Sequence, residues 1–134
     1  MHRPDDRSDA RERALYLLYE AHTKGIEPVA TIDLQVIEPD ELTQQLVLGV
    51  GNSITVIDEH IAAKAKGWSL TRMPVLDLNV MRLAVYELLE RHDVPTAVVL
   101  NEAVELVKRF STDDSGRFVN GVLASVATHV RPPG

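Results

Sequence analysis

Apolar residues recur at helical spacing along almost the whole chain, and this pattern constrains the fold more than any other feature. It is strongest over residues 75–91, where from Leu78 to Leu89 apolar side chains occupy nearly every side of a helix. A helix that is apolar all round belongs in the middle of a fold. We therefore predict an all-α domain with residues 75–91 as its central helix.

The remaining helices are predicted from local start and stop signals. Asp9 with Glu12 three residues on forms a capping box that opens the first helix, and Gly25 is a natural stop. Residues 26–38 indicate a short helix or irregular packing. We expect the further helices over 39–66, 75–91 and 95–110, then a polar loop over 111–116 and a last helix that ends at 131–133.

Length and composition bound the class of protein. A chain of 134 residues is typical of one domain, so we expect residues 1–134 to form a single unit. It contains no cysteine, which excludes a disulfide framework, a thiolate zinc site and a cysteine nucleophile. The N-terminus has no apolar signal region, and no apolar run approaches the ~18 residues of a membrane span. We expect a soluble, cytoplasmic protein.

Charge is distributed unevenly along the chain. The formal net charge is −6, and residues 25–63 carry seven Asp or Glu but no Lys or Arg. Residues 1–24 and 64–134 hold all the basic residues. Because a net negative chain is a poor general binder of polyanions, a nucleic-acid site must be local and lie towards the two ends.

No catalytic constellation assembles from the sequence. The five histidines are scattered, and neither a phosphate-binding glycine loop nor a zinc-ligand pair occurs. Glu102 and Glu105 share a helix face, but Lys108 and Arg109 follow at pairing distance and favour ion pairs within the helix. The acidic run 58–60 is interpreted as a solvated helix face. We predict no enzyme activity, no metal and no cofactor.

The start of the first helix is one candidate binding region. Arg7 and Arg11 are four residues apart and can share a face, whereas Arg13 points away. A solvated helix start with mixed charges explains the same residues. Tyr16 and Tyr19 can stack on a base or pack against the fold.

The segment 111–118 is the other candidate. A helix N-terminus offers free N–H groups to an anion, Arg117 adds a cation, and Phe118 can stack on an unpaired base. Asp114 can accept hydrogen bonds from a base edge. Alternatively, Asp113 and Asp114 only cap the helix, and Phe118 continues the core spacing.

Several segments of the chain carry specific motifs. They are Ala10-Arg11-Glu12 through Leu18-Tyr19, Trp68-Ser69-Leu70, Leu83–Leu89, Asp93-Val94-Pro95, Asn101–Lys108 and Asp114–Leu123. These segments resemble the NusB family of transcription antitermination factors. The last two are the most specific, because fixed polar positions recur there among the apolar ones, and residues 26–66 match least.

The resemblance implies an all-α fold of two packed helical bundles without enzyme activity. It implies a factor that binds the boxA element of ribosomal RNA leaders together with NusE, a ribosomal small-subunit protein, and acts on elongating RNA polymerase. By position it puts NusE binding at Asp77 and RNA binding at Arg7, Arg11, Tyr19, Asp114, Arg117 and Phe118. We expect the starts of the first and last helices to form one groove for unpaired ribonucleotides.

One departure keeps other functions open. Members of the family often open with a run of Arg or Lys, which Asp5-Asp6 and Ser8-Asp9 dilute here. Fewer phosphate contacts predict weak RNA binding without NusE. One alternative is a helical protein-interaction module or homodimer with a weakened RNA site. Another is the NusB-like domain of a ribosomal RNA methyltransferase, for which this chain has neither the length nor a glycine-rich cofactor loop.

Overall fold

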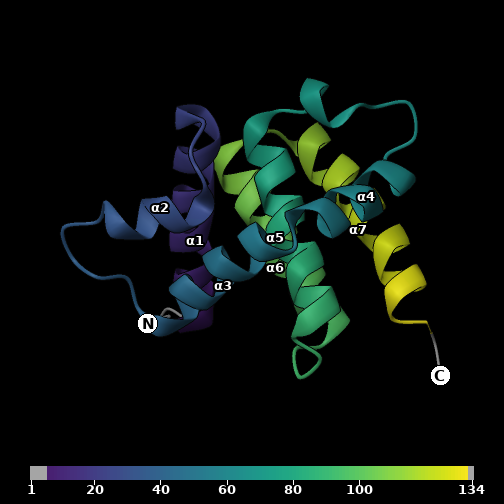
Figure 1. Cartoon of the computed structure of the whole chain (residues 1–134). Coiled ribbons are helices and arrows are strands. Elements are labelled where there is room, and N and C mark those ends of the chain that lie inside the picture. Colours follow the sequence, from purple (N-terminus) through teal and green to yellow (C-terminus); the bar gives the residue numbers. More distant parts are fainter. Residues whose placement is uncertain (1–5, 133–134) are drawn as a thin grey trace.

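The computed structural model describes residues 6–132, which form α-helices joined by short connections and one 3-10 turn (Figure 1). The predicted all-α class is confirmed within this range. Residues 1–5 and Pro133, which was expected to help end the last helix, lie outside it. The elements are α1 (Asp6–Lys24), α2 (Pro28–Asp33), α3 (Glu41–Asn52), α4 (Ile54–Lys64), η1 (Leu70–Arg72), α5 (Val75–Glu90), α6 (Thr96–Phe110) and α7 (Asp113–Val130).

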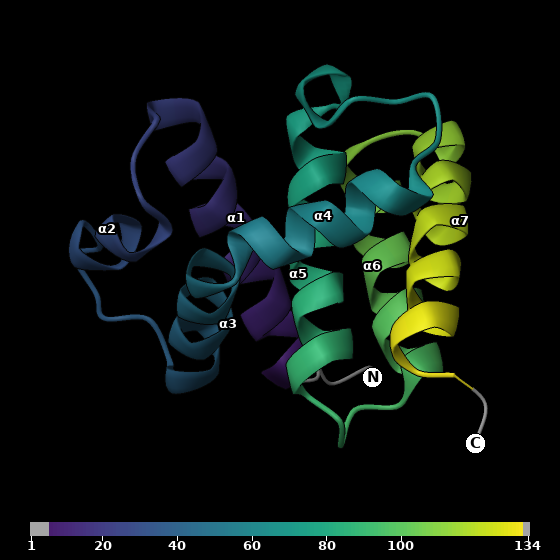
Figure 2. The ribbon, with the colours of Figure 1, turned by 45° about the vertical axis from the view of Figure 1, so that its right-hand side comes forward.

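The helices form two packed bundles, α1–α3 and α4–α7, as the family resemblance implies (Figure 2). Helix α5 contacts both bundles, and eleven of its residues are buried. The prediction of a central helix over 75–91 is therefore confirmed. No helix within residues 6–132 combines the length and apolar character that crossing a bilayer requires.

Proline and glycine set several helix ends where the sequence predicted them. Gly25 adopts a φ of +65° after α1, and the N–H of Ile26 donates to the carbonyl of Ala21 at 3.0 Å. This left-handed turn is open to glycine at little cost. Helices α5 and α6 begin directly after Pro74 and Pro95, whose rings suit a helix start.

Two predicted helix starts were wrong. Helix α1 already includes Asp6, so Asp9 lies inside the helix and does not cap it. Helix α7 begins at Asp113, because the side chain of Thr112 accepts a hydrogen bond from the N–H of Ser115 at 3.1 Å. Asp113 and Asp114 therefore belong to the first helical turn, and the predicted loop over 111–116 is shorter.

The long helix predicted over 39–66 is divided at Ser53 into α3 and α4. The two glycines before the break, Gly49 and Gly51, make close contacts. A Cβ atom on Gly49 would lie 2.2 Å from ring carbons of Tyr86 on α5, and one on Gly51 would lie 3.3 Å from Pro28. Glycine at position 49 thus allows α3 to approach the central helix.

Helix α3 starts at a hydrogen-bonded cap. The carboxylate of Asp40 accepts from the N–H of Thr43 at 3.2 Å and from its hydroxyl at 2.6 Å, and it pairs with Arg13 on α1. Burial raises the pKa of Asp40, but the hydrogen bonds from Thr43 and Arg13 outweigh burial and hold this pKa below its usual value.

Arg131, directly after α7, closes the C-terminal end of α5. Its guanidinium donates to backbone carbonyls in the last turn of α5 and in the connection to α6. A cation at this position also suits the negative end of the helix dipole. The bonds run to the carbonyls of Glu87 (3.1 Å), Leu88 (3.0 Å), Arg91 (2.9 Å) and Val94 (2.7 Å), and to the hydroxyl of Thr96 (3.2 Å).

Candidate nucleic-acid interface

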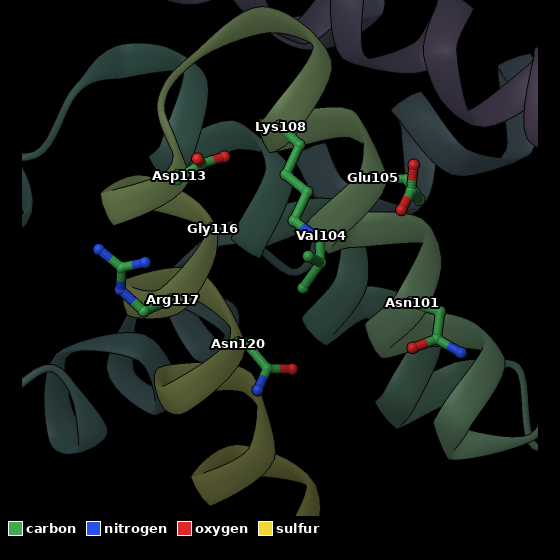
Figure 3. Close-up of a pocket in the computed structure, with 8 residues that line it drawn as sticks. All are labelled: Asn101, Val104, Glu105, Lys108, Asp113, Gly116, Arg117 and Asn120. Carbon is green, nitrogen blue, oxygen red and sulfur yellow. The ribbon is translucent and has the colours of Figure 1, made fainter.

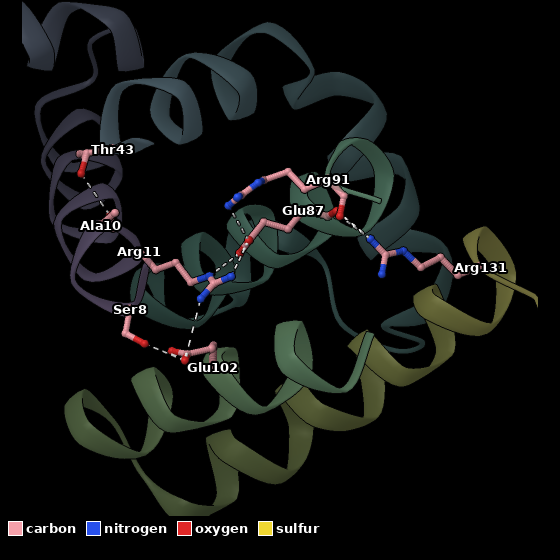
Figure 4. A network of polar contacts seen from close by, with 8 residues as sticks. All are labelled: Ser8, Ala10, Arg11, Thr43, Glu87, Arg91, Glu102 and Arg131. Carbon is pink, nitrogen blue, oxygen red and sulfur yellow. Dashed lines mark hydrogen bonds and ion pairs between the residues drawn. The ribbon is translucent and has the colours of Figure 1, made fainter. Parts of the chain in front are cut away.

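The structure places Arg11 in the interior, and this corrects its assignment as an RNA contact. Only 2% of the residue is exposed. Its Nε and Nη2 atoms lie 2.8 and 2.9 Å from the two carboxylate oxygens of Glu87 on α5 (Figure 4). A buried guanidinium held by two charge-assisted hydrogen bonds has no surface to offer to RNA. Arg11 instead fixes α1 against α5.

Further polar contacts join α1 to its neighbours around this ion pair (Figure 4). Ser8 donates to Glu102 on α6 at 2.7 Å, and Arg109 lies 2.6 Å from the carboxylate of Glu12. The ion pairs predicted within α6 for Glu102 and Arg109 were therefore wrong, because both residues pair across to α1.

The interpretation of the run 58–60 as a solvated helix face holds for Glu59, which is exposed, but not for Asp58. Asp58 is partly buried, and its two carboxylate oxygens accept from Arg82 on α5 at 2.8 and 2.9 Å. This contact ties α4 to the central helix. The ring centroids of His60 on α4 and His129 on α7 lie 6.0 Å apart.

Three of the predicted site residues meet in one hollow of about 190 Å³. Asp114 and Phe118 from the start of α7 lie there with Asp77 from the first turn of α5. The indole of Trp68 stands beside Phe118, with ring centroids 5.7 Å apart. Two residues predicted for RNA and the one predicted for NusE thus line the same hollow. Its other lining residues are Met73, Pro74 and Ser115.

Asp77 occupies an unusual position in this hollow. The residue is 2% exposed, and its Oδ1 atom has no hydrogen-bond partner among the described residues. Buried carboxylate oxygens are normally satisfied by donors, so an unsatisfied one lining a cavity indicates a place for a donor from outside.

Arg117 lines a second hollow, of about 540 Å³, between α6 and α7 (Figure 3). It is exposed and forms an ion pair with Asp114, so it joins the two hollows. Lys108 adds a second cation, but two acids, Glu105 and Asp113, line the trough as well. The side-chain amides of Asn101 and Asn120 point to the same trough. Cations and amides suit phosphate oxygens and base edges, respectively.

Arg7 and Tyr19 lie apart from these hollows. Both are exposed on α1, but twelve residues separate them, which is about 18 Å along a helix. Figures 1 and 2 both place the first turn of α1 at the opposite end of the molecule from the first turn of α7. The prediction that these two helix starts form one groove was therefore wrong. Phe118, although packed against the core, is only partly buried.

An exposed aromatic pair lies between the two regions, and sequence reasoning missed it. Tyr16 on α1 meets Phe110, the last residue of α6, edge to face with ring centroids 5.8 Å apart. The guanidinium of Arg109 lies 5.1 Å from the centre of the Phe110 ring. Phe110 itself is exposed, although it continues the apolar spacing of α6. Its position at the helix end, beyond the last buried turn, was the available signal.

Comparisons with known proteins converge on one family. The NusB family model matches residues 8–128. The transcription antitermination protein NusB of Saccharopolyspora erythraea is 50% identical over 127 residues, covering 90% of this chain and 86% of the relative. The structure of T. maritima NusB matches with a TM-score of 0.84 and 32% identity, covering 96% of this chain and 93% of that one.

A third match is to a chain from a complex with a protein and an RNA. A chain from the crystal structure of antitermination factors NusB and NusE in complex with dsRNA matches with a TM-score of 0.79 and 27% identity. The match covers 92% of this chain and 96% of that chain.

Proposed function

This chain belongs to the NusB family, and from this membership we propose that it is a transcription antitermination factor that binds RNA together with NusE. Its RNA is the boxA element of ribosomal RNA leaders, and the complex acts on elongating RNA polymerase in the cytoplasm. The observation that carries the proposal is the match to a structure of NusB and NusE with dsRNA. The role is binding, with no reaction catalysed.

The RNA contacts of this proposal centre on the start of α7. Trp68 offers exposed and Phe118 partly exposed aromatic surface beside Asp114. Arg117 and Lys108 offer cations in the adjoining trough, where Glu105 and Asp113 also lie. Stacking and base-edge contacts with arginine on phosphates are how proteins read unpaired RNA.

Arg7 and Tyr19 form a separate contact on α1 in this proposal. The pair Tyr16–Phe110, with Arg109 over the ring, lies between this region and α7. An extended single strand can follow this surface because aromatic rings stack on any base. Arg11 acts only by fixing α1 in place.

NusE binding at Asp77 is supported by the unsatisfied Oδ1 atom of that residue. A side chain of NusE that donates a hydrogen bond would satisfy this oxygen on entering the hollow. Asp114 and Phe118 line the same hollow, so NusE and RNA would bind next to each other. Neighbouring ligands that favour the same conformation raise each other's affinity.

The diluted charge at the start of α1 predicts that NusE adds most of the affinity. A gel shift of boxA RNA with the chain alone and with NusE measures this directly. We expect weak binding alone and a clear gain with NusE. Equal affinity in the two conditions would reject the shared role of NusE.

A substitution at Phe118 tests the RNA surface. Phe118→Ala should weaken the RNA complex by ~1–3 kcal/mol, the usual contribution of one stacked base. Because Phe118 also packs against the core, Phe118→Leu serves as the control that keeps apolar volume but removes the ring. We expect both variants to lose RNA affinity. Unchanged affinity in both would return Phe118 to a purely structural role.

A further inference from the structure

We infer that the connection between α2 and α3, residues 34–40, is a docking surface for a basic segment of a protein partner. Val36 is fully exposed at 102%, and Ile37 is exposed at 84%. Leu34 is also exposed. Single exposed apolar residues are ordinary, but three large ones within four positions form a patch of the kind found at binding sites.

The exposure of these side chains is fixed by hydrogen bonds at both ends of the connection. Gln35 donates to the carbonyls of Ile32 through its N–H at 3.2 Å and of Thr31 through its side chain at 2.9 Å. Gln44 on α3 donates to the carbonyl of Pro39 at 2.7 Å. Val36 and Ile37 are thus presented by a tethered backbone.

A hollow of about 320 Å³ lies beside this connection and offers a place for a partner side chain. Its apolar lining comes from Ile37 and Pro39 of the connection and from Tyr16 and Leu17 of α1. The further lining residues are Arg13, Gln35, Glu38, Asp40 and Thr43. An apolar anchor next to a pocket of this kind is typical of the centre of a protein interface.

The charge around the patch selects the partner. Residues 25–63 contain seven acidic residues and no Lys or Arg, and four of these acids flank the patch in exposed positions. They are Glu27, Asp33, Glu38 and Glu41. Arg13 lines the hollow, but its charge is matched by Asp40.

Such a surface repels the phosphates of RNA. Two copies of this chain that met face to face here would bring like charges together, which is unfavourable. A protein segment with Lys or Arg around aliphatic side chains is complementary in both charge and polarity.

The patch lies away from the RNA surface proposed at the start of α7, although Tyr16 borders both its hollow and the path proposed for RNA along α1. Figures 1 and 2 both show the connection between α2 and α3 at the outer edge of the first bundle, on the side away from α7. A partner bound there leaves Asp114 and Phe118 accessible. The inference therefore does not depend on the proposed function.

The test uses a labelled amphipathic peptide of Leu and Lys as the probe, with fluorescence anisotropy as the readout. Two matched peptides replace either Lys by Glu or Leu by Gln. The variant V36S/I37S removes the patch, and V56S, at an exposed valine of α4, is the control. We expect V36S/I37S to weaken Leu/Lys binding by roughly tenfold or more. We expect V56S to bind as the wild type does and both altered peptides to bind more weakly.

Equal affinity of the wild type and V36S/I37S would overturn the inference, as would equally tight binding of the acidic peptide. Two further measurements exclude the other occupants. Sedimentation that shows a dimer lost in V36S/I37S would assign the patch to a second copy and overturn the inference. Weaker binding of boxA RNA by V36S/I37S would assign it to the RNA surface and overturn it equally, whereas an unchanged RNA affinity supports it.

Discussion

A substitution of Arg11 distinguishes two roles for this residue. One is the buried ion pair that its position indicates, and the other is the RNA contact that the family resemblance implies. Arg11→Met keeps an unbranched apolar stem but removes the guanidinium that holds both oxygens of Glu87. Glu87 then stays buried with Arg91, whose Nη1 lies 3.2 Å away, as its remaining cation. A buried charge that loses its main partner cannot regain its hydration.

The expected cost follows from that geometry. Breaking a buried ion pair by removing one partner costs about 3–5 kcal/mol. A domain of this size has a stability of roughly 5–15 kcal/mol, so the variant loses a large part of it. The midpoint of thermal unfolding should fall by roughly 10–20 °C. Arg11→Met with Glu87→Met removes both charges and should recover most of the loss.

Thermal and urea unfolding measure these differences, and Arg13→Met is the matched control. Arg13 lies on the same helix, but its ion pair with Asp40 is exposed, so its loss costs at most about 1 kcal/mol. The RNA affinity of each folded variant is measured in parallel. An Arg11→Met variant of wild-type stability that binds boxA RNA more weakly would refute the structural assignment and restore Arg11 as an RNA contact.

Four further substitutions test how the helices pack and how their ends are held. Gly49→Ala should lower the free energy of unfolding in urea by about 1–3 kcal/mol, because the added Cβ would lie 2.2 Å from the ring of Tyr86. Gly121→Ala, which has open space around it, should instead raise the free energy of unfolding by ~0.5–1 kcal/mol. Arg131→Met should cost about 2–4 kcal/mol, because partly buried carbonyls directly after α5 lose a charged donor, and a loss below 0.5 kcal/mol would contradict this role. Because the pKa of Asp40 is lowered in the folded state, its carboxylate stabilises the fold above pH ~4, and this effect is lost as the pH falls through the folded pKa. The difference in unfolding free energy between the wild type and Asp40→Asn should therefore be largest near pH 7 and disappear in acid, as urea unfolding at several pH values will measure.

The sequence predicts local features of this fold well. An apolar pattern on every side gives α5 its central place, and Gly25, Pro74 and Pro95 mark helix ends through their own backbone restrictions. The division of the predicted helix 39–66 at Ser53 could not be predicted from the apolar pattern, because that pattern continues from α3 into α4.

The burial of Arg11 could have been predicted in part from the sequence, but the sequence analysis missed it. It falls four residues before Leu15 and seven before Leu18, on the face that packs inward, and Glu87 is the one charged residue in the segment Leu83–Leu89. Such a pair of misplaced charges indicates a buried ion pair. The distance between the starts of α1 and α7, in contrast, could not be predicted, because no local sequence pattern determines how two helices far apart in the chain are placed.

The most direct test of the RNA surface is an NMR titration of the labelled chain with boxA RNA in the presence of NusE. The account predicts that the backbone amides of residues 113–118 and the indole N–H of Trp68 shift or broaden as RNA is added, beyond the change that NusE alone produces. Signals that stay unchanged at these positions while RNA binds would contradict it.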